Sequence, residues 1–219
     1  MQKTYNPDNL SKSQLWMLAL CCILTEGNHE RHDILYFGKD VEDMTLCLRR
    51  DYGIKNRDDL IICLKELEDG SDFYTDFLDR SNFLSTLSEN SQSIYLSKLN
   101  KDSKKYKYYC IVKNYDYSIG CGKLRSWDYG RYVFLCRAGA FLNYISEEEA
   151  WDFMKEVAKK AQKAYSSWKE YGLAYVAGKQ YWQELITEDY ANKQIKLIKN
   201  LIVKEDSPWN MLDWNTPLD

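Results

Sequence analysis

The feature that most constrains this chain is a run of apolar residues near its amino terminus, from Leu15 to Leu24. The run holds ten residues, about half the number that a helix needs to cross a membrane. Ser11 or Ser13 can cap a helix at its start, and Gly27 can stop one at its end. Because such a helix is apolar on every side, protein has to surround it. The run therefore predicts a buried helix over 11–27.

Composition favours one globular domain over a disordered chain. Hydrophobic residues make up 45% of the 219 residues and aromatic residues 15%, enough to build a sizeable core. The three prolines lie near the two ends of the sequence, so the long middle is free to be helical. The sequence predicts an all-α (mainly α), single compact domain over 1–219, with a central helix over 11–27, peripheral helices over 40–100, a helical core over 121–203 and a docked tail over 204–219.

Capping signals mark the helices of the predicted core. Ser146 is followed by three glutamates and has the form of a capping box, in which Ser146 and Glu149 bond each other's backbone N–H groups. Apolar residues then recur at spacings of three and four, and Ser166 or Ser167 can cap the next helix. Lys104–Ile119 is rich in tyrosine and fits a strand or a helix. A lone strand has no partner in this sequence, so we expect a helix or an extended segment packed on the domain.

Charge is unevenly spread along the chain, although the formal net charge is only −3. Residues 57–79 hold eight acidic and two basic residues, a net charge of −6. Residues 98–125 hold eight basic and two acidic residues, a net charge of +6. The net negative charge argues against nucleic-acid binding. Solvated helix faces explain such segments most simply, and a surface for a partner protein is the alternative.

The cysteines and the first residues indicate a reducing compartment. The seven cysteines are odd in number and show no C-x-x-C spacing, which is typical of small buried hydrophobic residues. No basic stretch followed by an apolar stretch and a cleavage site opens the sequence. We expect a cytoplasmic protein that contacts no membrane and carries no cofactor.

Two histidines follow the first predicted helix. His29 and His32 lie in the order H-E-R-H, which differs from the H-E-x-x-H of zinc enzymes, and a third ligand of suitable spacing is missing. We therefore expect no tightly bound metal. A hydrogen bond between His32 and Asp33 that holds the loop is the favoured interpretation, and a general base is the alternative.

A carboxylate and a guanidinium share the apolar side of the helix expected over 122–139. Asp128 and Arg131 lie three residues apart and can form an ion pair. A buried charge has to be paired, and one carboxylate cannot satisfy the five donors of an arginine. We therefore expect Asp128 and Arg131 to meet His32 and Asp33 in one polar cluster, which is either an internal salt bridge or an anion site. Further candidate binding residues are Arg125, Trp127, Tyr171 and Tyr175.

Four segments together carry a resemblance to a known family. They read QLWMLALCCILTEGNHERHD from Gln14, LRRDYGIKNRDDL over 48–60, WDYGR over 127–131, and YISEEEAW leading on to YSSWKEYGLAYVAGKQYW, which ends at Trp182. In this combination the chain resembles the bacterial domain-of-unknown-function family 1266. The resemblance implies a cytoplasmic bacterial α-helical domain, and it supplies no catalytic residue.

Two hypotheses for function follow from these patterns. A protein that binds another protein, such as an immunity or partner protein of a toxin system, fits the charged segments, the eighteen tyrosines and the lack of catalytic or phosphate-binding motifs. The alternative is a small enzyme that uses the His/Asp/Arg cluster on an anionic substrate. A pocket that joins the two motifs would favour the enzyme, and a flat aromatic surface would favour the binding protein. The oligomeric state stays open.

Overall fold

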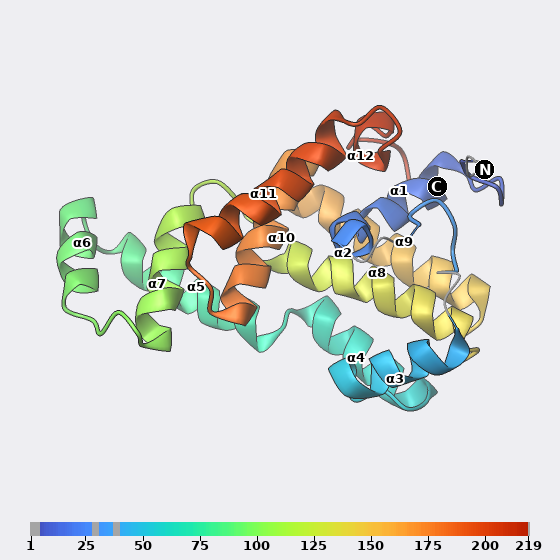
Figure 1. Ribbon diagram of the computed structural model, residues 1–219, viewed down its shortest axis with the longest axis horizontal. Helices are drawn as coiled ribbons and strands as arrows, with labels where there is room; N and C mark the ends of the chain where they lie inside the picture. The colour runs from blue at the N-terminus through green and yellow to red at the C-terminus, as the bar shows by residue number, and fades with distance from the viewer. Residues whose placement is uncertain (1–4, 28–30, 37–39, 219) are drawn as a thin grey trace.

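The computed structural model describes residues 5–27, 31–36 and 40–218 of the chain. Within these ranges it contains helices and no strand, which confirms the predicted all-α class. The helices build one elongated body (Figure 1). In chain order they are α1 (Lys12–Ala19), α2 (Cys22–Gly27), α3 (Val41–Tyr52), α4 (Arg57–Asp69), α5 (Asp72–Ser85), α6 (Glu89–Ser97), α7 (Lys104–Tyr115), α8 (Arg125–Phe141), α9 (Glu147–Ala164), α10 (Trp168–Gln183), α11 (Glu188–Val203) and α12 (Pro208–Met211).

Helix α8 runs through the middle of the body and packs against α2, α4, α9 and α10. Its residues from Ser126 to Ala140 are all buried except Arg131. Such close packing needs a small residue where α10 approaches. A Cβ atom added to Gly130 would lie 2.7 Å from the ring of Tyr175, so only glycine fits at that contact.

The helices begin and end at the capping residues that the sequence indicates. Asp40 and Asn56 cap α3 and α4 by accepting hydrogen bonds from backbone N–H groups of the first turn. Gly53 ends α3 in the left-handed conformation, at a φ of 71°. The predicted capping box of α9 is present at Ser146, and Ser167 is the residue that caps α10.

The apolar run is buried from Leu15 to Ile23, but its helix breaks between α1 and α2. At the break, the Nε1–H of Trp209 donates to the carbonyl of Ala19, and the hydroxyl of Tyr171 donates to the carbonyl of Leu20, each at 2.8 Å. These two carbonyls therefore bond side chains where a continuous helix would bond the N–H groups of the next turn. The prediction of one uninterrupted helix is wrong here, because donors distant in the sequence compete with the helical bonds.

The C-terminal tail packs onto the second half of α1 and the start of α10. Trp209, Leu212 and Trp214 are buried there. The ring of Trp16 lies 4.9 Å from the ring of Trp168 and 5.1 Å from that of Trp214, measured between centroids. Trp16 and Trp168 donate their Nε1–H groups to backbone carbonyls of the tail, at 3.2 and 2.8 Å. Apolar contact and satisfied indole donors together hold the tail in place.

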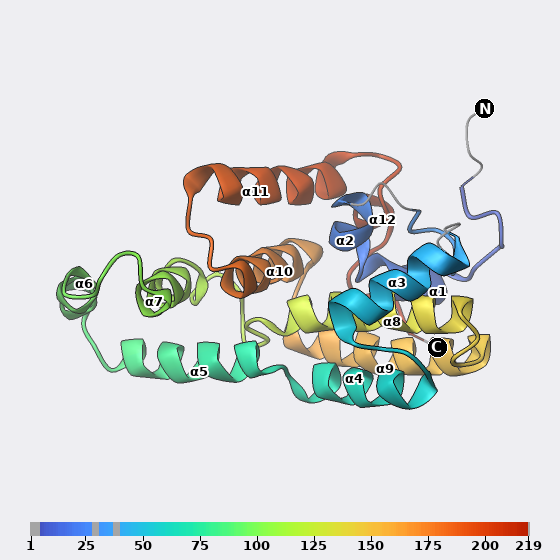
Figure 2. The same ribbon diagram turned by 60° about the horizontal axis from the view of Figure 1, so that its bottom comes forward.

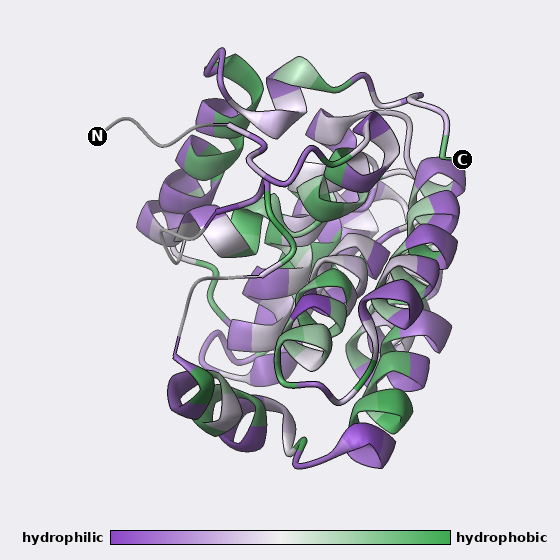
Figure 3. Cartoon of the chain, turned by 90° about the vertical axis from the view of Figure 1, so that its right-hand side faces the viewer, coloured by the Kyte–Doolittle hydropathy of each residue, from purple (hydrophilic) through white to green (hydrophobic). Residues whose placement is uncertain are grey.

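Helices α5, α6 and α7 form a projection at one end of the body, with α6 outermost in both Figure 1 and Figure 2. Of the two forms expected over 104–119, a helix or a packed extended segment, the chain adopts the helix α7 as far as Tyr115. Hydrophilic and hydrophobic bands alternate along the outer helices in Figure 3, which is the pattern of helices with one buried side. Within the described ranges, each helix is too short or too polar to span a membrane.

Candidate functional site

Asp128 and Arg131 form an ion pair one turn apart on α8. Arg131 Nη2 donates to Asp128 Oδ1 at 2.5 Å. The other carboxylate oxygen accepts two hydrogen bonds from Ser71, one from its backbone N–H and one from its hydroxyl, both at 3.2 Å. Ser71 stands at the N-cap position of α5, yet its side chain makes no capping bond and reaches α8 instead. The carboxylate thus ties the start of α5 to the central helix.

Burial decides what the Asp128 carboxylate can do. Its side chain is fully buried, and this burial raises its pKa, while Arg131 and Ser71 act in the opposite direction. A general acid or base has to reach the proton that it transfers. Because both oxygens of Asp128 are bonded inside the protein, we assign this carboxylate a positioning role: it holds the guanidinium of Arg131.

Arg131 is the partly exposed member of the pair, with 15% of its side chain accessible. Its guanidinium lies over the ring of Trp127, with Cζ 4.8 Å from the ring centroid. An open hollow adjoins it, between the end of α4 and the start of α5. Phe73 lines this hollow, and exposed acidic residues form its rim: Glu66, Asp69 and Asp72.

An exposed aromatic side chain lies next to Trp127, the ring on which Arg131 stacks. Trp182, at the end of α10, is 48% exposed. The centroid of its ring lies 5.8 Å from that of Trp127, on which Arg131 stacks. Tryptophan and arginine are the residue types that contribute most to protein interfaces. We call Arg131, Trp127, Trp182 and the adjoining hollow the Arg131 centre.

The predicted meeting of Asp128 and Arg131 with the loop that carries His32 and Asp33 is wrong. In the described part of the chain, no hydrogen bond or ion pair joins the two pairs. Asp33 bonds Arg31 and the backbone N–H of Asn6. The Nδ1 of His32 lies 3.3 Å from the hydroxyl of Thr25 instead of bonding Asp33. His29 lies outside the described residues.

Different causes set the pKa values of these two loop residues. Burial alone would raise the pKa of Asp33, but its hydrogen bonds with Arg31 and Asn6 outweigh burial and lower it. Burial lowers the pKa of His32, with Glu26 and Asp33 acting against it. The lowered pKa favours the neutral form of His32, which a general base requires, but no second catalytic group accompanies it among the described contacts.

The arginine that holds this loop is Arg137, which is fully buried. Its guanidinium donates to the backbone carbonyls of Arg31, Ile34 and Leu35 at 2.9 to 3.0 Å, and it lies 3.2 Å from the sulfur of Cys21. Six residues separate it from Arg131 on α8, a rotation of about 240° around a helix of 3.6 residues per turn. The two guanidinium groups therefore point in different directions, which is why Arg131 does not reach the loop.

The further candidate binding residues lie mainly inside the domain. Trp127, Tyr171 and Tyr175 are each at most 5% exposed, so they do not form the outer recognition surface that was expected. Tyr171 bonds the backbone of α1 and α8. The Oη of Tyr175 and the Nε1 of Trp127 have no hydrogen-bond partner among the described residues. Arg125 donates to the carbonyl of Glu68 at 2.6 Å and acts between helices.

One polar cluster was not predicted from the sequence. Arg80 forms a two-point ion pair with Asp76, at 2.8 and 2.9 Å, and also bonds the hydroxyl of Tyr181 at 2.9 Å. The ring of Tyr108 stacks on that of Tyr181, with centroids 4.2 Å apart. The cluster joins α5, α7 and α10. The spacing of four residues between Asp76 and Arg80 signals the ion pair, but nothing in the sequence indicates Tyr181 as its third member.

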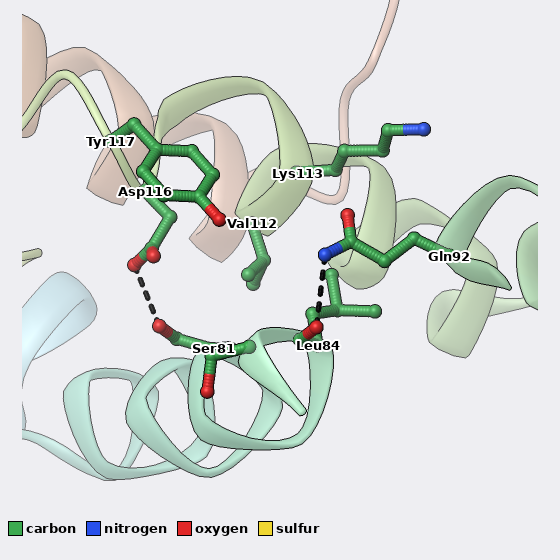
Figure 4. A pocket seen from close by; sticks show the side chains of 8 residues that line it. Ser81, Leu84, Gln92, Val112, Lys113, Asp116 and Tyr117 are labelled. Atoms are coloured by element: carbon green, nitrogen blue, oxygen red, sulfur yellow. Dashed lines mark hydrogen bonds between the residues drawn. The ribbon is translucent and has the colours of Figure 1, made fainter. Parts of the chain in front are cut away.

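A small pocket lies in the projection, between α5, α6 and α7 (Figure 4). Ser81 donates to Asp116 at 2.7 Å, and the amide of Gln92 donates to the carbonyl of Leu84 at 2.9 Å. Its free volume is about 10 Å³, room for about one water molecule. We therefore assign this pocket to packing. Over the residues that the structure describes, no group of three or more His, Cys, Asp or Glu side chains is placed to hold a metal ion.

The fold and the site define an all-α domain whose central helix carries a buried ion pair beside an acidic hollow. The chain belongs to the family described as "Protein of unknown function (DUF1266)", whose profile matches residues 47–214. This match confirms the predicted family.

Two proteins of Escherichia coli (strain K12) are similar to the chain. The uncharacterized protein YbeR is 29% identical over 132 residues, which cover 55% of this chain and 55% of YbeR. The uncharacterized protein YbeU is 31% identical over 171 residues, which cover 76% of this chain and 69% of YbeU. The chain thus spans about half the length of YbeR. No solved structure matches the chain.

Proposed function

We propose that this protein is a bacterial, cytoplasmic domain that binds another protein, and that the Arg131 centre is its contact site. The observation that carries the proposal is the exposed Trp182 next to Trp127, on whose ring stacks an arginine that is held in place by a buried carboxylate. Such preorganised aromatic and arginine side chains contribute strongly to protein interfaces, because little freedom is lost when they bind.

The charge around the hollow indicates the kind of partner. Glu66, Asp69 and Asp72 are exposed at the rim, and none of them has an ion-pair partner among the described residues. A basic surface on the partner complements this rim and is steered towards it. Arg131 then acts as a hydrogen-bond donor to a carbonyl of the partner. More specifically, we propose that the chain is an immunity or partner protein of a toxin system.

The alternative, a small enzyme that acts on an anionic substrate, has less support. Its expected group of His32, Asp33, Asp128 and Arg131 lies in two separate places. Asp128 is buried and fully bonded, and the acidic rim repels an anion.

Photo-crosslinking in the native bacterium tests the proposal. A benzoylphenylalanine placed at Trp182 should trap one defined protein, because this position belongs to the Arg131 centre. The same probe at Val203, which is 63% exposed on α11, is the matched control and should not trap that protein. The toxin hypothesis further predicts that the trapped protein is a toxin encoded next to this gene.

Charge reversal then shows whether the acidic rim recognises the trapped protein. Glu66→Lys together with Asp69→Lys should abolish the adduct at position 182. Glu205→Lys together with Asp206→Lys, an equal change at exposed acids after α11, should leave it intact. Equal adducts from positions 182 and 203, or an adduct that survives reversal of the rim, would refute the proposed site.

A further inference from the structure

The outer side of α4 and the start of α5 form an acidic face. We define this acidic face as Asp58, Glu66, Asp69 and Asp72, all of them exposed. None of the four has an ion-pair partner in the described part of the chain. Ile62 lies on the same side of α4, one turn from Asp58 and from Glu66, and is 58% exposed. The face thus carries four carboxylates and one apolar side chain, and the exposed Lys65 lies one turn from Ile62 and from Asp69 on the same side of α4.

The turn between α6 and α7, at the far end of the projection, has the opposite charge. We define the basic tip as Lys98, Lys101 and Lys105, which are exposed and have no ion-pair partner among the described residues. The neighbouring Lys104 is already paired with Glu184. Ile94 lies one turn before Lys98 on α6 and is 48% exposed. The basic tip therefore places exposed lysines near an exposed isoleucine, as the acidic face places carboxylates near one, and the exposed Asp102 follows Lys101.

The two patches cannot neutralise each other within one molecule. Helix α5 separates them, and its 14 residues span about 21 Å. That length exceeds the distance of about 8 Å over which charges interact at physiological salt. Figures 1 and 2 both place the α6–α7 turn at one end of the body and α4 well away from it. Both patches are therefore left for another molecule.

We propose that this molecule is a second copy of the chain, with the basic tip of one copy docked on the acidic face of the other. A two-fold axis repeats the contact in reverse, so the two copies form a closed dimer with two identical contacts. Because Glu66, Asp69 and Asp72 also border the Arg131 centre, the dimer covers that centre and competes with a basic partner. This inference goes beyond the proposed function, and purified protein alone tests it.

Sedimentation velocity of the full chain gives the first test. We expect a dimer at about 50 mM NaCl that dissociates to monomers at about 500 mM NaCl, because salt screens exposed charges. Lys101→Glu with Lys105→Glu, or Glu66→Lys with Asp69→Lys, should each weaken the dimer by at least roughly tenfold, since each places like charges at both contacts. Lys193→Glu with Lys196→Glu, on the exposed side of α11, is the matched control and should keep the dimer.

Mixing the two charge-reversed variants gives the decisive test. In a mixed pair, the acidic tip of one variant faces the basic face of the other, and the unchanged tip faces the unchanged face, so both contacts are complementary again. Equimolar mixing should therefore restore a salt-sensitive dimer that neither variant forms alone. A wild-type protein that is monomeric at low salt, a dimer that persists at high salt, or a mixture that stays monomeric would overturn the proposal. Failure here leaves the crosslinking test of a partner unaffected.

Discussion

Replacing the buried Arg137 with methionine should destabilise the domain without unfolding it. The side chain of Arg137 is fully buried and holds the 31–35 loop onto α8 through three backbone carbonyls. Methionine fills a similar volume and donates no hydrogen bond, so the substitution tests the donors rather than the packing.

The size of the effect follows from the surroundings of each acceptor. The hydrogen bond to the carbonyl of Leu35 is buried, and an unsatisfied buried acceptor costs about 1–3 kcal/mol. The carbonyls of Arg31 and Ile34 are partly accessible and can bond water, so each contributes less. Removing a buried cation also removes the free-energy cost of its desolvation, which offsets part of this loss of stability. We expect a net loss of about 3 kcal/mol, which lowers the Tm of a domain of this size by about 6–12 °C.

Thermal and urea unfolding followed by circular dichroism measure this loss. The matched control is Arg50→Met, because Arg50 is 77% exposed and pairs only with its neighbour Asp51. Such a surface pair contributes about 0–1 kcal/mol, so the control should melt close to wild type. Arg137→Lys keeps the charge but bonds fewer carbonyls, so its stability should lie between that of Arg137→Met and that of the Arg50→Met control. An Arg137→Met protein as stable as the control would refute the inferred role.

Three further substitutions test other contacts. Leu18→Asp should unfold the domain, because it places an unpaired charge at a fully buried position. Its control, Leu46→Asp, changes a side chain that is 57% exposed and should be tolerated in the same circular dichroism melts. Tyr171→Phe removes the hydroxyl that donates to the carbonyl of Leu20 at the α1–α2 break, and it should lower the free energy of unfolding in urea by about 1–3 kcal/mol. Its control, Tyr117→Phe, changes a side chain that is 84% exposed and should leave that free energy unchanged. Asp33 has a lowered pKa, so its contribution to stability is present above the unfolded value of about 4 and is lost as pH falls through the folded pKa. Asp33→Asn should therefore be less stable than wild type at pH 7, and the difference should shrink as the pH falls below about 4 in the same melts.

Local rules explain the parts of the fold that could be predicted from the sequence. Asp40, Asn56 and Ser146 each stand directly before an apolar repeat, and each caps the helix that follows. The break after α1 could not be predicted in this way, since Trp209 and Tyr171, which bond its carbonyls, are distant in the sequence. Capping depends on residues within one turn, whereas the break depends on which distant donors the fold brings close.

The same distinction explains the mixed outcome for the candidate site. The pairing of Asp128 with Arg131 was predictable, because three residues on a helix place two side chains on one face. Ser71 as the second partner of Asp128 was not, since it belongs to another helix start. The apolar side of the helix was taken to define where Arg131 points, but nearly every side of α8 is buried, so apolar periodicity does not distinguish its faces.

The three arginines of α8 show what helical geometry adds to that argument. Arg125, Arg131 and Arg137 follow one another at intervals of six residues, so each is turned by about 240° from the one before and they point in three directions. Arg125, which is half-buried, bonds a backbone carbonyl at the end of α4, and the fully buried Arg137 bonds backbone carbonyls of the 31–35 loop. Arg131 alone of the three pairs with a carboxylate of its own helix and borders the acidic hollow. Two arginines therefore fix neighbouring segments onto α8, and the third borders the hollow that we propose as the contact site.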